Sequence, residues 1–349
     1  MKFGEFMAGL QKDGLKHVYL LAGEERYYIE KAREKLFSRL FANRQEQNGA
    51  LQKLTGAMDI DDLVGLIETA PFFASKNVLL LQDTTLFNEQ KKDEGESKKL
   101  GKDKKMERLL ATLADMPDFS YVIFVQHGKA DKRRKLYKTI EKCGTVLEAE
   151  AIRAWNINDW LQGKLQSLNK DMDREAVAYF SGVVSTMQTI SLEFLDKEFD
   201  KLALFTKERQ ITKALLIKVF AGLPEVSVFA MLDAISERKA KKALQLLRRQ
   251  LNDGTYFTVI LSLLTRHVRQ LWQAQVLQQQ GIRGKALAKP LELNPFIAEK
   301  LGRAAMQFPS LVLKRSMLEL IDADYFLKTG QAGEEILEHV VIDLCQGKV

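Results

Sequence analysis

Cysteine is scarce in this chain, which has only Cys143 and Cys345 among 349 residues. The two lie far apart without paired spacing, which argues against a disulfide scaffold and against a zinc ribbon, and a reducing compartment fits best. Long apolar runs are missing as well, since no stretch approaches the ~18 residues of a membrane helix. The first apolar run, residues 18–22, is too short for a signal peptide. These absences predict a cytoplasmic protein without membrane contact.

Motifs for catalysis are missing too. The sequence has no GxSxG or GxGxxG fingerprint, and its four histidines share no metal-binding spacing. The adjacent carboxylates Asp61 and Asp62 stand at an expected helix start, where the helix dipole favours them without a catalytic role. We therefore expect no catalytic residue, no metal and no cofactor.

The composition itself is that of an ordinary globular protein, with 46% apolar and 28% charged residues. The length is sufficient for two or three domains with their own cores. Lys and Arg exceed Asp and Glu by 53 to 46, which gives a net charge of +7. This modest excess permits work near nucleic acid but does not demonstrate it.

Strand and helix patterns alternate over residues 1–150. Three of the strand candidates are continuous apolar runs, as in parallel strands that helices cover on both faces. The expected strands are 17–23, 50–56, 77–83, 121–127 and 145–150, and the expected helices are 28–41, 61–70, 106–113 and 132–142. This alternation predicts an α/β domain with a parallel sheet. Residues 89–105 interrupt it with charged residues and glycine, which indicates a mobile surface loop.

The rest of the chain is expected to be helical, because the strand signals stop after residue 150. Asn156 is expected to cap the first helix. Further helices are expected over 174–185, 192–205 and 212–220. Pro224 cannot continue the preceding helix, and it indicates a hinge at 223–225. We predict a small all-α domain over 151–222 and a second all-α domain over 223–349.

The first strand and helix resemble the frame of a nucleotide-binding P-loop, with the turn at Gly23. A functional loop needs glycines whose N–H groups cradle phosphate, a Lys for the β/γ-phosphates and a Ser or Thr for Mg²⁺. Counted from Gly23, these positions hold Tyr28, Ile29 and Glu30, which would block or repel phosphate. The third strand ends in Asp83 with no Glu after it, so we interpret Asp83 as a turn-capping residue. ATP hydrolysis is not expected.

A pair of adjacent phenylalanines follows the helix expected over 61–70. Pro71 ends that helix, and Phe72 and Phe73 precede the next strand. Adjacent side chains on a turn point in different directions, so both rings are hard to bury in one core. They could form a hydrophobic wedge for a partner's pocket. The alternative is that one or both rings pack under the edge of the sheet.

A basic segment occupies residues 128–138 and is expected to lie on a helix. Its cations include Lys132, Arg133, Arg134 and Lys135. Such a helix could contact phosphates of DNA or a neighbouring subunit. The alternative is a solvated helix face.

Several segments, in their order and spacing, resemble the delta subunit family of the bacterial DNA polymerase III clamp loader over nearly the whole chain. These segments are 19–32, 70–81, 131–138, 191–205, 248–254, 263–271 and 328–330. The first of these segments, 19–32, contains the Gly-Glu-Glu that the family has in place of a P-loop. The resemblance implies a degenerate AAA+ core over 1–150, a helical lid over 151–222 and a collar over 223–349 that joins the loader subunits.

The resemblance also implies a non-enzymatic role in DNA replication. The chain would be classed with the DNA-directed DNA polymerases (nucleotidyltransferases) only because it is part of the holoenzyme. Phe72 and Phe73, presented by Pro71, would enter a pocket of the sliding clamp (the beta subunit) and open the ring. The tau/gamma and delta prime subunits would be partners through the collar, with primer–template DNA held in the complex. Two other functions stay open: an active AAA+ ATPase and a stand-alone DNA-binding protein.

Overall fold

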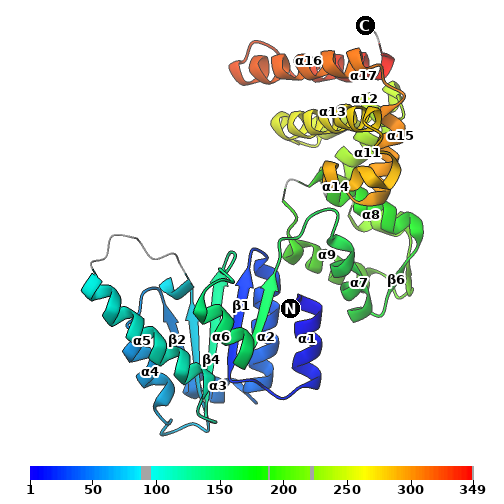
Figure 1. The fold of residues 1–349 in the computed structure, drawn as a ribbon. Helices are drawn as coiled ribbons and strands as arrows, with labels where there is room; N and C mark the ends of the chain where they lie inside the picture. The colour runs from blue at the N-terminus through cyan, green and yellow to red at the C-terminus, as the bar shows by residue number, and fades with distance from the viewer. Residues whose placement is uncertain (88–95, 188, 221–223, 348–349) are drawn as a thin grey trace. The chain divides into compact units, whose positions relative to one another are not determined.

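The computed structural model describes residues 1–87, 96–187, 189–220 and 224–347. The chain divides into two compact units, Met1–Ala151 and Ile152–Val349. The first is an α/β unit and the second consists almost entirely of helices (Figure 1). The predicted fold class, α/β followed by helical regions, is confirmed.

A five-stranded parallel sheet forms the centre of the first unit, in the order β2-β3-β4-β1-β5. The strands are β1 (Val18–Gly23), β2 (Leu51–Thr55), β3 (Asn77–Gln82), β4 (Ser120–His127) and β5 (Thr145–Ala149). Strand β1 lies between two neighbours, with Leu20 paired to Phe124 on β4 and to Val146 on β5. Every residue of β1 is buried, because helices cover both faces of the sheet at this central strand. The end of β1 at Gly23 therefore lies beside the ends of both neighbouring strands.

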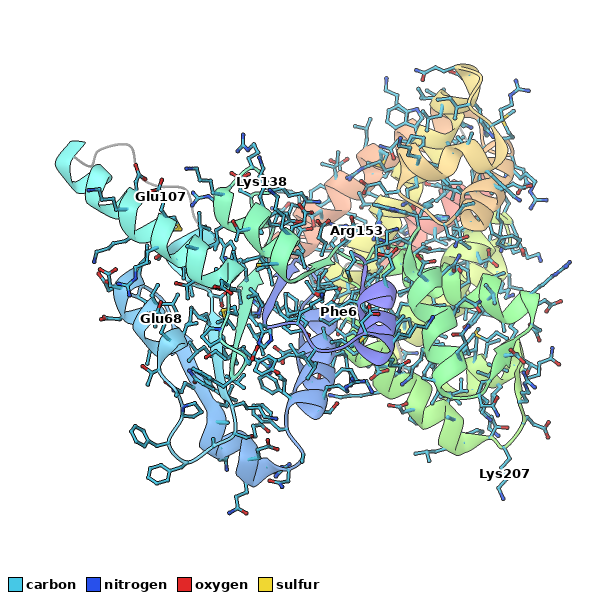
Figure 2. All side chains as sticks on the ribbon, turned by 60° about the horizontal axis from the view of Figure 1, so that its bottom comes forward. Phe6, Glu68, Glu107, Lys138, Arg153 and Lys207 are labelled. Carbon is cyan, nitrogen blue, oxygen red and sulfur yellow. The ribbon has the colours of Figure 1, made fainter. Side chains whose placement is uncertain are left out.

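Helices cover both faces of this sheet (Figure 1). On one face, α4 (Ile60–Glu68), α5 (Glu96–Ala114) and α6 (Lys135–Cys143) form one apolar core with alternate strand residues such as Leu20 and Leu79. On the other face lie α1 (Phe3–Lys12) and α2 (Arg26–Leu40). There Phe6, labelled in Figure 2, meets Tyr19 of β1 edge-on, with ring centroids 6.3 Å apart.

The structure corrects two predictions in this unit. The loop predicted over 89–105 is wrong for residues 96–105, which form the first turns of α5, while 88–95 lie outside the described residues. The basic helix begins at Lys135 and not at Lys132, because Asp131 accepts a hydrogen bond from the backbone N–H of Arg133 at 3.0 Å. Arg134 then has an extended backbone as the N-cap. Helices α1 and α3 (Arg44–Ala50) were not predicted.

Two bundles of helices follow one another in the second unit. The first comprises α7 (Ile157–Ser167), α8 (Arg174–Thr186), α9 (Leu192–Phe205) and α10 (Lys213–Val219). The second comprises α11 (Pro224–Ser236), α12 (Ala240–Asn252), α13 (Phe257–Gln279), α14 (Ala288–Leu291), α15 (Pro295–Ala305), α16 (Ser310–Thr329) and α17 (Glu335–Gln346). The helices predicted over 174–185, 192–205 and 212–220 are confirmed, and the domain boundary at 222 stays a prediction.

Two sequence expectations fail in the second unit. A two-stranded parallel sheet, β6 (Asp171–Met172) with β7 (Gln210–Ile211), contradicts the expectation that strands end at residue 150. Asn156 does precede α7, but its side chain accepts a hydrogen bond from the N–H of Arg153 at 2.6 Å and leaves the helix end uncapped. No helix in the described parts of the chain has the length and apolarity needed to cross a membrane.

Candidate functional site

Phe72 and Phe73 lie in the loop between α4 and β3, and the side chains are 94% and 103% exposed. The ring centroids are 6.5 Å apart and the planes are inclined at 45°. This exposure excludes the alternative that the rings pack under the sheet edge. The two adjacent aromatic side chains therefore form an exposed apolar surface that does not contribute to the hydrophobic core.

Hydrogen bonds secure both ends of this loop. Thr69 caps the C-terminus of α4, since its backbone N–H and its hydroxyl both donate to the carbonyl of Gly65, at 3.0 and 2.6 Å. At the other end, the side-chain amide of Asn77 donates to the carbonyl of Leu66 at 2.7 Å. The first residue of β3 is thus joined to the last turn of α4, and the phenylalanine pair stands on a fixed base.

Lys76 adds a third attachment for the loop. Its ammonium group donates to the carbonyl of Leu40 at the end of α2, at 2.6 Å, and lies 3.0 Å from the Glu46 carboxylate on α3. A hydrogen bond from the N–H of Ala42, followed by that from Lys76, lowers the pKa of Glu46. The loop is therefore held by helices on both sides of the sheet.

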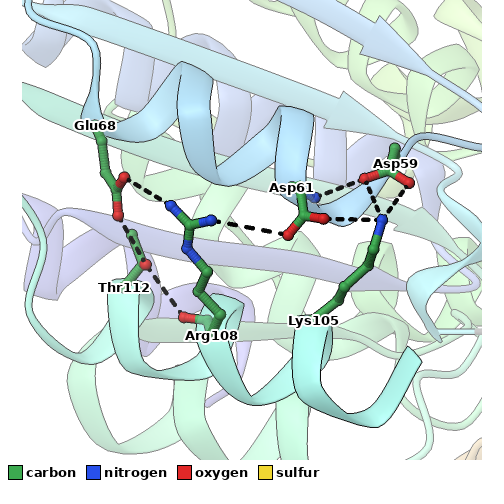
Figure 3. A network of polar contacts seen from close by, with 6 residues as sticks. All are labelled: Asp59, Asp61, Glu68, Lys105, Arg108 and Thr112. Atoms are coloured by element: carbon green, nitrogen blue, oxygen red, sulfur yellow. Dashed lines mark hydrogen bonds and ion pairs between the residues drawn. The ribbon is translucent and has the colours of Figure 1, made fainter. Parts of the chain in front are cut away.

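Ion pairs join α4, the helix that carries the loop, to α5 (Figure 3). The ammonium group of Lys105 lies 2.8 Å from carboxylate oxygens of both Asp59 and Asp61, and Arg108 lies 3.3 Å from Glu68. Hydrogen bonds to the two aspartates raise the pKa of Lys105. Such exposed pairs contribute little stability each, but together they fix the position of one helix against the other.

The turn from β1 into α2 takes only two residues, Glu24 and Glu25. Their backbone N–H groups both donate to the carbonyl of Ala149 on β5, at 2.8 and 3.1 Å. The side chain of Glu25 caps α2 by accepting from the N–H of Tyr27 at 3.1 Å. A P-loop directs such N–H groups at phosphate, whereas here the chain itself occupies them.

Gly23 also has a structural role at this turn. Its φ is +148°, and a Cβ atom at this position would lie 2.0 Å from the Ala149 carbonyl oxygen. The glycine therefore allows the end of β1 to approach β5 closely. This requirement explains the glycine without any bound phosphate.

The three positions that depart from the P-loop pattern have partners within the protein. Tyr28 is buried and its ring stacks on Phe3, with centroids 4.2 Å apart. Ile29 is fully buried, and Glu30 forms an ion pair with Arg33 one turn later. These side chains fill the space beneath the start of α2.

Asp83 directly follows β3, and its carboxylate binds the end of the neighbouring strand β4, so a role in capping the turn after β3 stays a prediction. Its carboxylate accepts the N–H of His127 at 3.0 Å and lies 2.8 Å from the His127 Nδ1 atom. Partial burial opposes ionisation, but the hydrogen bonds from His127 outweigh it and lower the pKa of Asp83. Among the described residues, no group of three or more His, Cys, Asp or Glu side chains could hold a metal ion.

Three of the four predicted cations have partners inside the first unit. Lys132 lies 2.6 Å from Glu148, Arg133 pairs with Asp131, and Arg134 donates to the carbonyl of Leu86 at 3.2 Å. Lys135, at the start of α6, is exposed and has no ion pair or hydrogen bond of its side chain within the described ranges. Contact of this segment with DNA stays a prediction.

A second exposed apolar surface lies on α16 and was not identified from the sequence. Its members are Leu311, Leu318, Ile321 and Tyr325. Their spacing of seven, three and four residues places them along one face of the helix, as in a coiled-coil seam. The opposite face packs into the core of the second unit through Leu313 and Leu320. The signal in the sequence is a helix with two apolar stripes, of which a core needs only one.

Comparison with known families gives two matches, and both are to DNA polymerase III delta subunits. Residues 19–150 match the model of the family described as "DNA polymerase III, delta subunit". Residues 225–344 match that described as "DNA polymerase III delta subunit, C-terminal domain". Together these ranges take in more than half of the chain.

Individual relatives agree with this result. The chain is 23% identical to DNA polymerase III subunit delta of Bacillus subtilis over 335 residues, covering 94% of this chain and 92% of that protein. It is also 23% identical over 341 residues to the probable DNA polymerase III subunit delta of Aquifex aeolicus, covering 92% and 90%. The fold is similar to the solved structure of the Bacillus subtilis DNA clamp loader delta protein, with a TM-score of 0.64, 20% identity and 99% coverage of both chains.

Proposed function

The chain belongs to the family of DNA polymerase III delta subunits, and from this premise we propose that it binds the sliding clamp through Phe72 and Phe73 and holds the ring open. The observation that carries the proposal is the full exposure of both rings on a loop secured at both ends. A rigid base reduces the entropy lost when the rings enter a pocket. Pro71 precedes the pair and limits the conformations of the backbone that presents it.

Opening the clamp requires no bond-breaking chemistry. A ligand shifts an equilibrium between closed and open rings only by its difference in affinity for the two states. A buried aromatic side chain removes ~150–250 Å² from water, and a central aromatic anchor contributes ~2 kcal/mol or more at an interface. Two such rings therefore favour the open ring to the extent that their pocket is better formed there than in the closed ring.

The subunit does not hydrolyse ATP in this proposal, and it acts as a non-catalytic part of the DNA polymerase III holoenzyme. Two observations on the turn after β1 support this. Ala149 accepts the N–H groups of Glu24 and Glu25, and the chain has Ile29 where a P-loop has its lysine. The turn therefore lacks both the free donors and the cation that hold the phosphates of ATP.

Assembly with the other loader subunits, tau/gamma and delta prime, takes place through the C-terminal helices. The exposed stripe of Leu311, Leu318, Ile321 and Tyr325 on α16 supports this proposal, because it offers a seam for a helix of another subunit. Primer–template DNA is held by the assembled loader. Lys135 and Lys138 are cations of the basic segment without an ion pair in the described structure, and they are the first candidates for a phosphate contact.

Binding of the purified chain to its sliding clamp tests the wedge. The double variant Phe72→Ala/Phe73→Ala should lose about 2 kcal/mol or more, roughly thirtyfold in Kd, because both anchors are removed. Both side chains are exposed, so circular dichroism and the thermal midpoint should stay unchanged.

A matched control exists at the end of α9, where Leu204 and Phe205 form another exposed apolar pair, 90% and 54% accessible. Leu204→Ala/Phe205→Ala removes a similar apolar area far along the chain and should leave clamp binding intact. An equal loss of clamp affinity in the two double variants would indicate non-specific hydrophobic binding and not a wedge. Absence of clamp binding by the unaltered chain would reject the proposal.

A further inference from the structure

The second unit contains a groove of about 840 Å³ between α8 and α10 on one side and α11, α12 and α15 on the other. Its apolar lining includes Tyr179, Ile217, Leu246, Phe296 and Ile297. Ile217 and Phe296 remain 42% and 48% exposed on opposite sides of the groove. The volume suits a ligand that buries a few side chains, such as a short peptide segment.

Most acidic side chains that line the groove have an ion-pair partner, whereas several basic side chains have none among the described residues. Most of the carboxylates are already paired, in Asp233–Lys300, Glu237–Lys239 and Asp253–Arg249. The cations Lys213, Lys242 and Arg303 are exposed and have no ion pair within the described residues. Glu175 is the lining carboxylate that has no ion pair there. Lys213 also lies over the ring of Tyr179, with its ammonium group 5.8 Å from the ring centroid. The groove therefore has three positive charges and one negative charge without an ion-pair partner in the described structure, around an apolar floor.

Close packing forms this groove before any ligand arrives. On its floor, Phe229 of α11 lies against α8 so closely that a Cβ atom on Gly182 would be 2.2 Å from the phenyl ring. Tyr179 of α8 meets the same ring edge-on at 5.8 Å. Arg266 of α13 donates to the carbonyl of Met187 at the end of α8, at 3.1 Å. The two walls are thus held in place, which lowers the cost of binding.

We propose that this groove binds a short acidic, apolar peptide segment of a partner protein. The unpaired cations select carboxylates, while Ile217, Phe296 and the floor receive aliphatic or aromatic side chains. Duplex DNA would use the cations but would leave the apolar floor unfilled, because its bases are stacked inside the double helix. A single strand could stack its bases on the aromatic lining, and competition with an oligonucleotide tests this occupant. The proposal is independent of clamp binding, since no residue of the groove belongs to the α4–β3 loop.

A random peptide library displayed on phage, selected on the immobilised full chain, tests the proposal. The enriched sequences should combine Asp or Glu with Leu, Ile or Phe, and a labelled peptide of the enriched sequence is then titrated by fluorescence anisotropy. Lys213→Glu/Arg303→Glu should weaken binding roughly tenfold or more, and added salt should also weaken it. Ile217→Ser tests the apolar half separately and should weaken binding at unchanged salt dependence.

The matched control reverses two exposed cations of the same unit outside the groove, Lys207→Glu/Lys285→Glu (Lys207 is labelled in Figure 2). It should bind the peptide as the unaltered chain does. Enrichment of neutral or basic sequences, an equal loss in the control, or full displacement of the peptide by a single-stranded oligonucleotide would overturn the proposal. Clamp binding measured on the same variants should stay unchanged, so a failure here is separate from a failure of the proposed function.

Discussion

The ring of Tyr28 stacks on the ring of Phe3, with centroids 4.2 Å apart and planes inclined at 15°. Tyr28 stands where a P-loop has its second glycine, so an aromatic contact between α1 and α2 replaces the approach of a phosphate. The turn before it is closed by Ala149, whose carbonyl accepts two N–H groups. The residues at these positions contribute to the packing of α2 in this structure.

Gly23→Ala should destabilise the first unit strongly. The new methyl group would lie 2.0 Å from the Ala149 carbonyl oxygen, and φ of +148° is unfavourable for any residue with a Cβ. We expect a loss of about 2 kcal/mol or more in the free energy of unfolding, measured with urea. Gly65→Ala on α4 is the matched control, because a Cβ there has open space around it. It should be neutral or stabilising by up to about 1 kcal/mol.

MgATP should not stabilise the chain against thermal unfolding. A ligand at 100 times its Kd would add about 2.7 kcal/mol, which a thermal scan detects easily. A clamp-loader subunit with an intact P-loop serves as the positive control. The same result is expected for Tyr28→Gly/Ile29→Lys/Glu30→Ser, which restores the motif letters but inserts a lysine at a fully buried position. Stabilisation of the unaltered chain by nucleotide would favour the ATPase alternative.

The sequence predicts the sheet of the first unit well because parallel strands buried on both faces are continuous apolar runs, as in β3. It does not predict α1, a short helix that buries only Phe6 and Leu10. The strands β6 and β7 are two residues long and exist only through their pairing. No local pattern specifies such elements.

For the candidate site, too, the sequence predicts local features but not those that depend on tertiary contacts. The sequence identifies Phe72 and Phe73 as a pair that is hard to bury, and it leaves their exposure open. Exposure depends on Lys76 and Asn77, which attach the loop to residues distant in sequence such as Leu40. Likewise Lys132 is basic in sequence, but its charge is compensated by Glu148 on a neighbouring strand.

Charge on the α16 stripe should prevent assembly with the other loader subunits. Leu318→Glu/Ile321→Glu places two carboxylates on the exposed apolar seam, so burial against a partner helix becomes unfavourable. Size-exclusion chromatography of a reconstituted mixture should show the variant eluting apart from the complex, while its clamp binding is retained. Phe72→Ala/Phe73→Ala should show the reverse behaviour. A stripe variant that assembles normally would place the subunit interface on another face.

Gly182 and Phe229 should be energetically coupled. Gly182→Ala forces a methyl group into the phenyl ring of Phe229, and such overpacking costs about 1–3 kcal/mol. Phe229→Leu removes part of the ring, so the double variant should be more stable than the sum of the single effects, by about 0.5 kcal/mol or more. Urea unfolding of the four proteins measures this coupling. Gly163→Ala, at a helical position with open space, is the control and should show no coupling with Phe229→Leu.

His267 should make the second unit less stable in acid. The ring lies in a small cavity with Asp233 and Lys300, where its Nε2 atom is 2.8 Å from the Ser236 hydroxyl. Burial, and then the positive charge of Lys300, lower the pKa of His267 to about 4. An unfolded chain has the ordinary histidine value near ~6.5, so it binds more protons than the folded chain between these two values. This contribution to stability is complete above pH ~6.5 and is lost as the pH falls to about 4.

Replacement by a group that cannot titrate isolates this effect from the carboxylates that also titrate in acid. His267→Gln keeps a partner for Ser236 and should show a flatter dependence of the unfolding free energy on pH between 6.5 and about 4. The difference from the unaltered chain should reach at most roughly 3 kcal/mol, and less where the ring contacts water through the cavity. His339→Gln changes an exposed histidine on α17 and should leave the slope as it is. Parallel slopes for the unaltered chain and His267→Gln would mean that the folded protein accepts a proton at this site without cost.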